Sequence, residues 1–299
     1  MDTVKRKNHE ATRSYIELWQ SSNGLDRGVW SLQLAGLSRK NQVLPVFEQA
    51  NPINSKGIQK SPVRFAIRDF LYVPVGVDDA RDDELENKFG EYESQMIAFC
   101  RASVKGICSS GKAENVVKGL VGCLTHSVRD FFGWDALHSL IQKNGFSEKA
   151  SNFEPKVHRK LVHNAYCFIE EYTKLVRTWS WTVLWNLPHT LVTCDRPCWD
   201  LRFTKDPEDI VYMPLSPTTL LMGIPEKSPK NIVLNLGYVD SRNAGQQTID
   251  KWNHMTTERA RSWIVGDSCA VLNNLMPLLT PQLYASRVAT DTPRFRSSV

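Results

Sequence analysis

The stretch 178–188, Thr-Trp-Ser-Trp-Thr-Val-Leu-Trp-Asn-Leu-Pro, is the part of the chain around which the rest is organised. Its tryptophans, Trp179, Trp181 and Trp185, stand at the end of a predicted helix, and Pro188 ends that helix because proline cannot continue its hydrogen bonds. Side chains this large are expected to pack in the core rather than to stack on nucleic-acid bases. We therefore predict a buried, tryptophan-rich helical tail.

Short apolar segments broken by prolines follow this tail. Their composition is typical of strands, and they are expected to form a largely antiparallel meander over 189–194, 210–213, 218–224 and 231–236. The turn Asp195-Arg196-Pro197 separates the first two segments, since Asp can bond the backbone two residues on and Pro fixes φ. The second half of the chain is thus predicted to be rich in strands.

The middle of the chain has the apolar spacing of amphipathic helices. The pattern is clearest at 85–100, where apolar residues recur every three or four positions. Further helices are predicted at 10–19, 113–132, 134–143, 155–179 and 246–263, and strands at 28–34 and 63–73. Strands at both ends of a helical middle favour an α+β fold with one sheet-bearing domain. Its predicted parts are an N-terminal portion (1–76), a helical segment (77–187) and a C-terminal portion that completes the sheet (188–299).

Composition excludes several classes of protein. The 299 residues are 41% hydrophobic, which is enough for a packed core, and no apolar run suits a membrane span or a signal peptide, so a cytoplasmic location is expected. The seven cysteines are scattered and form no CxxC pair, so reduced, buried thiols are predicted. His189, Cys194 and Cys198 are residue types that bind zinc, but no fourth ligand stands at a usual spacing, and no metal site is predicted.

The formal net charge of +5 is compatible with nucleic-acid binding but is far from that of a dedicated binder. Basic residues exceed acidic ones in 1–70, and Lys5, Arg6 and Lys7 are the candidates for contacts to phosphate. Runs of charge more often simply face solvent. Motifs of P-loop, dinucleotide, serine-hydrolase and zinc-protease sites are missing, and Arg159 and His163 only approach the spacing of a helical ribonuclease motif.

The run Cys194-Asp195-Arg196-Pro197, followed by Met213-Pro-Leu-Ser-Pro217, resembles the core of a bacterial family known as domain of unknown function 4238. The opening from Lys7 to Trp19 is similar to that family in its His, Arg and Tyr but lacks its proline, and Cys194 stands where the family usually has Ser. The order of these motifs along nearly the whole chain carries the resemblance. Because relatives of the family occur among candidate anti-phage genes, the resemblance implies a role in defence without a defined reaction.

Four residues are the predicted catalytic candidates: His9, Arg13, Asp195 and Asn253. A helix over 10–19 would place His9, Arg13 and Glu17 on one stripe, where Asp195 could orient the imidazole of His9 for proton transfer. Asp195 could instead only cap its own turn. Asn253 matches a C-terminal Asn of the resembled family and could donate from its amide, or its amide could be satisfied within the core.

The leading hypothesis is an effector that acts on nucleic acid or nucleotides through this His/Arg/Asp cleft. Two alternatives stay open: a non-catalytic module that binds a phage or host protein, and a small-molecule hydrolase. No membrane partner is expected, and neither a cofactor nor an oligomeric state is assigned.

Overall fold

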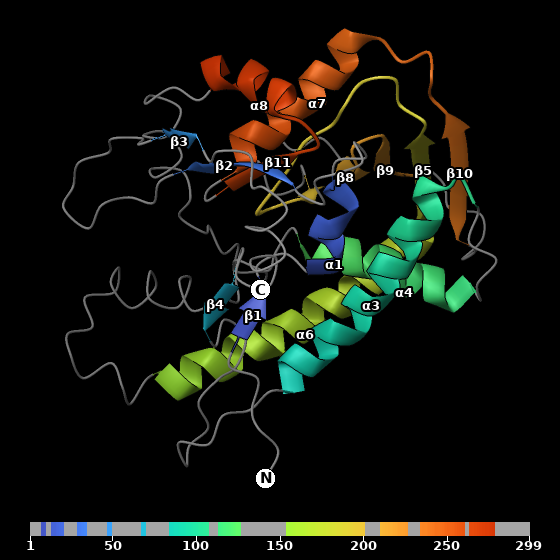
Figure 1. Ribbon diagram of the computed structural model, residues 1–299. Coiled ribbons are helices and arrows are strands. Elements are labelled where there is room, and N and C mark those ends of the chain that lie inside the picture. The colour runs from blue at the N-terminus through green and yellow to red at the C-terminus, as the bar shows by residue number, and fades with distance from the viewer. Residues whose placement is uncertain are drawn as a thin grey trace.

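The structure of the chain is a computed structural model (Figure 1) that describes residues 7–9, 13–20, 29–34, 47–49, 67–69, 84–107, 113–126, 154–200, 210–226, 234–260 and 263–278. It combines helices with two larger sheets, which confirms the predicted α+β class. The helices α3, α4 and α6 lie on one side of the strands, and α7 and α8 lie on the other (Figure 1).

A five-stranded sheet occupies the centre in the order β10-β5-β9-β8-β7. Its strands are β5 (Trp179–Trp185), β7 (Trp199–Asp200), β8 (Val211–Ser216), β9 (Thr219–Pro225) and β10 (Asn235–Asp240). The pairs β5–β9, β8–β9 and β7–β8 are antiparallel, as the predicted meander requires, whereas β10 pairs with β5 in parallel. The predicted helical segment 77–187 therefore ends in an interior strand of this sheet rather than in a helix.

A four-stranded antiparallel sheet joins the two ends of the chain in the order β3-β2-β11-β6. Its strands are β2 (Trp30–Leu34), β3 (Phe47–Gln49), β6 (Thr193–Cys194) and β11 (Trp263–Gly266). A separate pair links β1 (Lys7–His9) with β4 (Ile67–Asp69).

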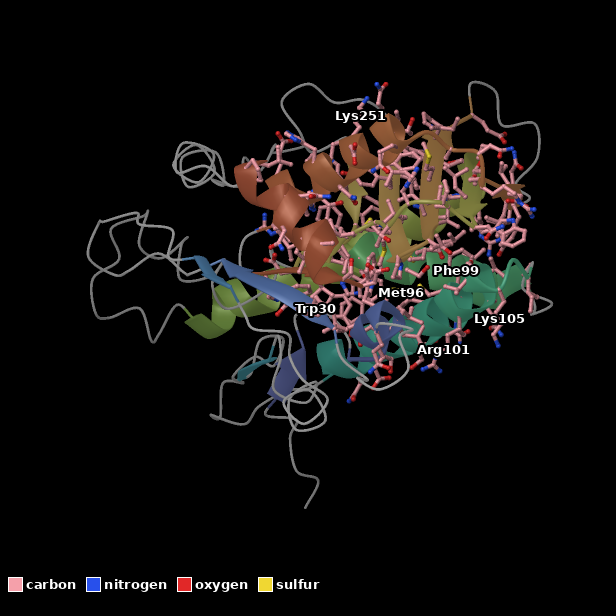
Figure 2. The ribbon with its side chains drawn as sticks, turned by 45° about the horizontal axis from the view of Figure 1, so that its top comes forward. Trp30, Met96, Phe99, Arg101, Lys105 and Lys251 are labelled. Atoms are coloured by element: carbon pink, nitrogen blue, oxygen red, sulfur yellow. The ribbon has the colours of Figure 1, made fainter. Side chains whose placement is uncertain are left out.

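The helices are α1 (Arg13–Ile16), α3 (Glu84–Val104), α4 (Ala113–Thr125), α6 (Glu154–Thr178), α7 (Gln246–Arg259) and α8 (Cys269–Leu275), with 3-10 turns η1 (Glu17–Trp19) and η5 (Met276–Leu278). The helix predicted at 85–100 is confirmed as α3: Met96 and Phe99 point into the core, whereas Arg101 and Lys105 point outward (Figure 2). None of the described helices is both long and apolar enough to cross a membrane.

The helices α3 and α4 pack with their backbones in contact. A Cβ atom built on Gly122 of α4 would lie 2.5 Å from the carbonyl oxygen of Tyr92 on α3, so this crossing requires glycine. Around it, the buried side chains of α3, α4, α6 and the inner face of the five-stranded sheet form one continuous core, which includes Met96, Leu120 and Val176.

The prediction of a helix through the tryptophans is wrong, because Trp179–Trp185 is β5. Alternate side chains of β5 point to one face, so Trp179, Trp181 and Val183 are all buried there. The Trp181 ring crosses β9 at Gly223, where an added Cβ would lie 2.4 Å from the ring, and its Nε1–H donates to the Val176 carbonyl at 3.0 Å. The expectation that these rings belong to the core is confirmed for Trp179 and Trp181.

Several other predicted boundaries are corrected. The helix 246–263 ends at Arg259, and Trp263 begins β11, a strand that was not predicted. The strand 189–194 is reduced to Thr193–Cys194, the strand 231–236 becomes Asn235–Asp240, and the helix 113–132 has ended at Thr125. The helix predicted at 134–143 lies outside the described residues. The side chains of residues 159 and 163 are not described either.

Candidate functional site

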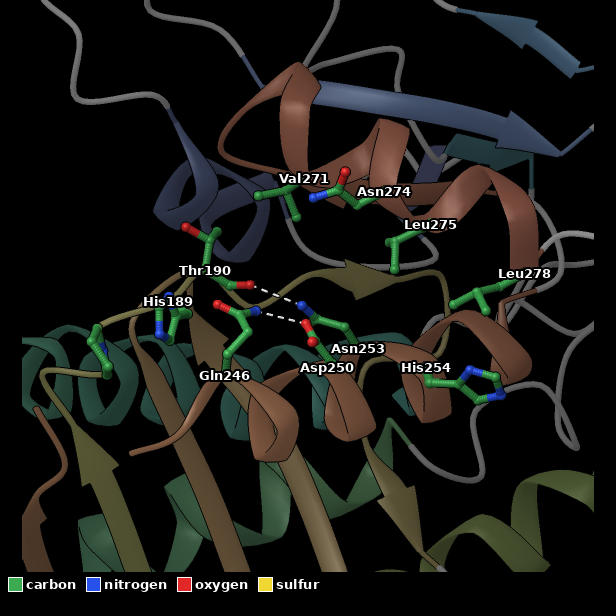
Figure 3. A pocket seen from close by; sticks show the side chains of 11 residues that line it. His189, Thr190, Gln246, Asp250, Asn253, His254, Val271, Asn274, Leu275 and Leu278 are labelled. Carbon is green, nitrogen blue, oxygen red and sulfur yellow. Dashed lines mark hydrogen bonds between the residues drawn. The ribbon is translucent and has the colours of Figure 1, made fainter. Parts of the chain in front are cut away.

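A cleft of about 470 Å³ separates α7 from α8 and the turn η5, and the segment 188–190 closes one end (Figure 3). The helix α7 supplies one wall, and α8 with η5 supplies the other. His189 and His254 lie toward opposite ends of the cleft in this view. A cavity of this volume falls within the range of about 300–1,000 Å³ that is typical of small-molecule sites.

The wall from α7 is a polar stripe of four residues: Gln246, Asp250, His254 and Glu258. Residues four apart on a helix stand above one another, and two neighbouring pairs are bonded here. The amide of Gln246 donates to Oδ1 of Asp250 at 2.6 Å, and Nε2 of His254 lies 2.9 Å from Oε1 of Glu258. The first three residues line the cleft, and Glu258 holds the ring of His254 from the next turn.

The opposite wall is largely apolar. Val271, Leu275 and Leu278 turn toward α7, and Asn274 is the exposed polar residue among them. Leu275 also packs with Val192 and Ile264, so this wall is anchored in a small core between α8 and the four-stranded sheet. A molecule in the cleft would meet hydrogen-bonding groups on one side and hydrocarbon on the other.

Asn253 forms the floor of the cleft. Its Nδ2 donates to the Thr190 carbonyl and its Oδ1 accepts from the Val192 N–H, both at 2.9 Å. The residue is 5% exposed, so the predicted catalytic amide lines the cleft but bonds the backbone through both of its ends. The alternative that its amide is satisfied within the core therefore describes it better. Beside it, the Thr190 hydroxyl donates to Asp267 at 3.2 Å.

Asp195 is not among the residues that line the cleft, and its N–H donates to the Trp263 carbonyl of β11 at 3.4 Å. The buried Cys194 thiol closes the turn that contains Asp195: it accepts from the Arg196 N–H at 3.4 Å and donates to the Arg196 carbonyl at 3.2 Å. Burial raises the pKa of this thiol well above its usual value, and the adjacent Asp195 carboxylate acts in the same direction. Cys194 is therefore a protonated structural thiol.

A stack of aromatic and cationic groups adjoins this turn. The rings of Trp199 and Tyr212 are stacked with centroids 5.6 Å apart, and the Arg259 guanidinium lies 5.6 Å from the Trp199 ring centre. Burial raises the pKa of the Tyr212 hydroxyl, while the positive charge of Arg259 acts against that shift. This arrangement fixes the end of α7 to strands β7 and β8, at one edge of the five-stranded sheet.

The predicted stripe of His9, Arg13 and Glu17 is wrong as a helical stripe, because His9 lies in β1, opposite Ile67, and α1 begins only at Arg13. The side chains of His9 and Arg13 are outside the described part, as is that of Lys7, and residues 5 and 6 are not described at all. Convergence of His9 and Arg13 on Asp195, and contacts of 5–7 with nucleic acid, stay predictions.

The neighbourhood of α1 and the Asp195 turn is nevertheless fixed by Tyr15. Its hydroxyl donates to the Pro214 carbonyl at 2.5 Å and lies 2.8 Å from the Thr193 hydroxyl, which stands two residues before Asp195. Burial raises the pKa of this hydroxyl far above its usual value. Tyr15 is completely buried.

The cysteines of the described ranges are all free, and Cys194 and Cys198 are buried. Those ranges contain no group of three or more His, Cys, Asp or Glu side chains placed to hold a metal ion. His189 lines the cleft, apart from the two thiols.

Comparison with known proteins gives no relative from which to assign the site: no family model, curated protein sequence or solved structure matches the chain. The resemblance to domain of unknown function 4238 therefore stays a prediction.

Proposed function

We propose that the protein binds a small organic molecule in the cleft between α7 and α8. One observation carries the proposal: a polar wall and an apolar wall face each other across a space of about 470 Å³. The polar wall is the hydrogen-bonded stripe on α7, and the apolar wall consists of Val271, Leu275 and Leu278. Ligand sites commonly combine an apolar surface with a few placed polar groups. The polar wall would orient the ligand, and the apolar wall would take hydrocarbon out of water.

The second candidate is a small-molecule hydrolase, which the pair of His254 and Glu258 favours. A carboxylate bonded to one imidazole nitrogen orients the ring, so that the other nitrogen can accept a proton from a water molecule. That water would attack an electrophilic carbon of a ligand held against α8. The pair is partly exposed, with 45% and 39% of the two side chains accessible, and solvent water can therefore reach it.

Action on nucleic acid or nucleotides, and a role in defence, are less well supported by this cleft. Among the residues that the structure describes, those that line it include neither Lys nor Arg, whereas recognition of phosphate generally relies on these cations. Binding of nucleic acid by Lys5, Arg6 and Lys7 stays a separate prediction.

The proposal is tested by a screen of small organic fragments with ligand-observed NMR on the full chain. In Asn274→Trp an indole would occupy the cleft from the exposed position on α8, and fragments that bind the cleft should lose binding. Gln247→Trp adds the same ring at an exposed position of α7 outside the lining, and it should retain binding. Fragments that bind both variants equally well would show that the cleft is not the site.

The hydrolase candidate is tested with His254→Gln. Gln keeps a hydrogen-bonding side chain but cannot act as a base near neutral pH, so turnover of a panel of small esters and amides should fall at least about a hundredfold. Binding of fragments should persist. Turnover that is unchanged in His254→Gln would leave binding alone as the function.

A further inference from the structure

The charges around the cleft are unequal. Asp250 lines its centre, Glu258 adjoins it through His254, and Asp267 adjoins it through Thr190. Lys251 follows Asp250 in the sequence, but its side chain is at the outer edge of α7 and points away from the body (Figure 2). The cleft is therefore bordered by carboxylates, and the described residues that line it include neither Lys nor Arg.

Asp250 is held in position for a ligand. The bond from Gln246 occupies its Oδ1 and fixes the side chain, while no described residue bonds Oδ2. A carboxylate oxygen at the edge of an apolar surface favours a partner that is a charged donor, because such hydrogen bonds are roughly twice as strong as neutral ones. The apolar wall of α8 faces it across the cleft (Figure 3).

An opposing influence comes from the N-terminal end of α7. The free N–H groups of the first turn carry a partial positive charge that favours anions. This end starts at Gln246, so Asp250 stands one turn further in, with a full negative charge. An anion bound at the cleft would have to approach that carboxylate, and the full charge outweighs the partial one there.

We propose that the cleft selects ligands that carry an ammonium or guanidinium group, bound by Asp250, together with an apolar portion that packs on Val271, Leu275 and Leu278. This inference rests on the proposed binding function and adds the chemical class of the ligand to it. Basic amines of low molecular mass and guanidino compounds are the molecules that have this chemistry.

Three probes of nearly equal shape test the charge: phenethylamine, 2-phenylethanol and 3-phenylpropanoate. Their affinities for the full chain are measured by NMR titration at pH 7.5 and low salt. An exposed ion pair is worth up to about 1 kcal/mol, so the amine should bind about fivefold more tightly than the alcohol, and the carboxylate should bind most weakly. The preference should shrink at high salt, since salt screens exposed charges.

Asp250→Asn keeps the shape of the side chain and removes its charge, so the amine should lose its preference over the alcohol. Glu171→Gln removes an exposed carboxylate from α6, outside the cleft, and should keep the preference. This control separates a local contact from a change in net charge.

The outcomes for the ligand class and for the cleft are distinguishable. Equal affinities for the three probes, a preference for the carboxylate, or an unchanged preference in Asp250→Asn would overturn the cationic class. If the probes bind equally and Asn274→Trp abolishes their binding, the cleft remains a binding site and only the inference fails. If neither the probes nor any fragment binds the parent protein, both proposals fail.

Discussion

Asn253 is expected to stabilise the fold strongly, although it lines the cleft. Replacement by Ala removes two buried hydrogen bonds and leaves the Thr190 carbonyl and the Val192 N–H without their partner. Each of these two buried backbone groups costs about 1–3 kcal/mol when it is left without a partner, so the total loss is about 2–6 kcal/mol. For a chain of this size that corresponds to a fall in Tm of roughly 3–10 °C.

The assay is thermal unfolding followed by circular dichroism, with Asn274→Ala as the matched control. Asn274 faces the same cleft from α8 but is exposed, so its removal should change Tm by no more than about 1 °C. Asn253→Asp is a sharper probe, because a carboxylate oxygen would face the Thr190 carbonyl and should destabilise the fold at neutral pH. An Asn253→Ala protein with unchanged Tm and abolished fragment binding would refute this reasoning and restore Asn253 as a functional amide.

Two further predictions concern buried contacts of the core. Tyr15→Phe should lower the free energy of unfolding by about 1–3 kcal/mol, because it strands the Thr193 hydroxyl and the Pro214 carbonyl. Since burial raises the pKa of Tyr15, the folded state keeps this proton at a pH where the unfolded chain loses it, so the contribution of Tyr15 to stability falls as pH rises above about 10. Urea titrations should therefore show that the free energy of unfolding falls less steeply above this pH in the variant than in the parent protein. Gly223→Ala should destabilise by about 1–3 kcal/mol, since its Cβ would collide with the Trp181 ring; an unchanged urea midpoint would contradict that packing.

The helices α3 and α6 were predictable because their signals are local. Apolar residues recur at helical spacing along α3, and Pro155 lies in the first turn of α6, where proline costs no hydrogen bond. The strand β5 was not predictable in the same way. The helix α6 ends at Thr178 and β5 begins at the next residue, Trp179. No proline or glycine marks this boundary in the sequence.

What decides β5 is tertiary contact. The indole N–H of Trp181 donates to a carbonyl of α6, and its ring packs against Gly223. Residues two apart, such as Trp179 and Trp181, place their side chains on the same face in a strand but not in a helix. The strand β11 escaped prediction for a related reason. Its four residues are all buried between β2 and β6, so they show no alternation.

The site was predicted only in part. Asn253 was singled out, but sequence could not show that its amide bonds the backbone of 190–192. The polar stripe of α7 was not predicted, although Asp250, His254 and Glu258 follow one another at intervals of four residues in the sequence. A polar helical face is ordinarily solvated, and only the position of α8, fixed by packing on β11, turns this face into the wall of a cleft.

The helix α7 connects the cleft to both sheets, and this gives Asn253 its importance. At its C-terminal end Arg259 packs over Trp199 of the five-stranded sheet, while in its middle Asn253 fixes the segment that leads into β6 of the four-stranded sheet. The wall from α8 packs on the four-stranded sheet. The width of the cleft is thus set by how α7 is held against residues 190–192, so a variant that loosens this floor should weaken ligand binding even when it leaves Asp250 and His254 unchanged.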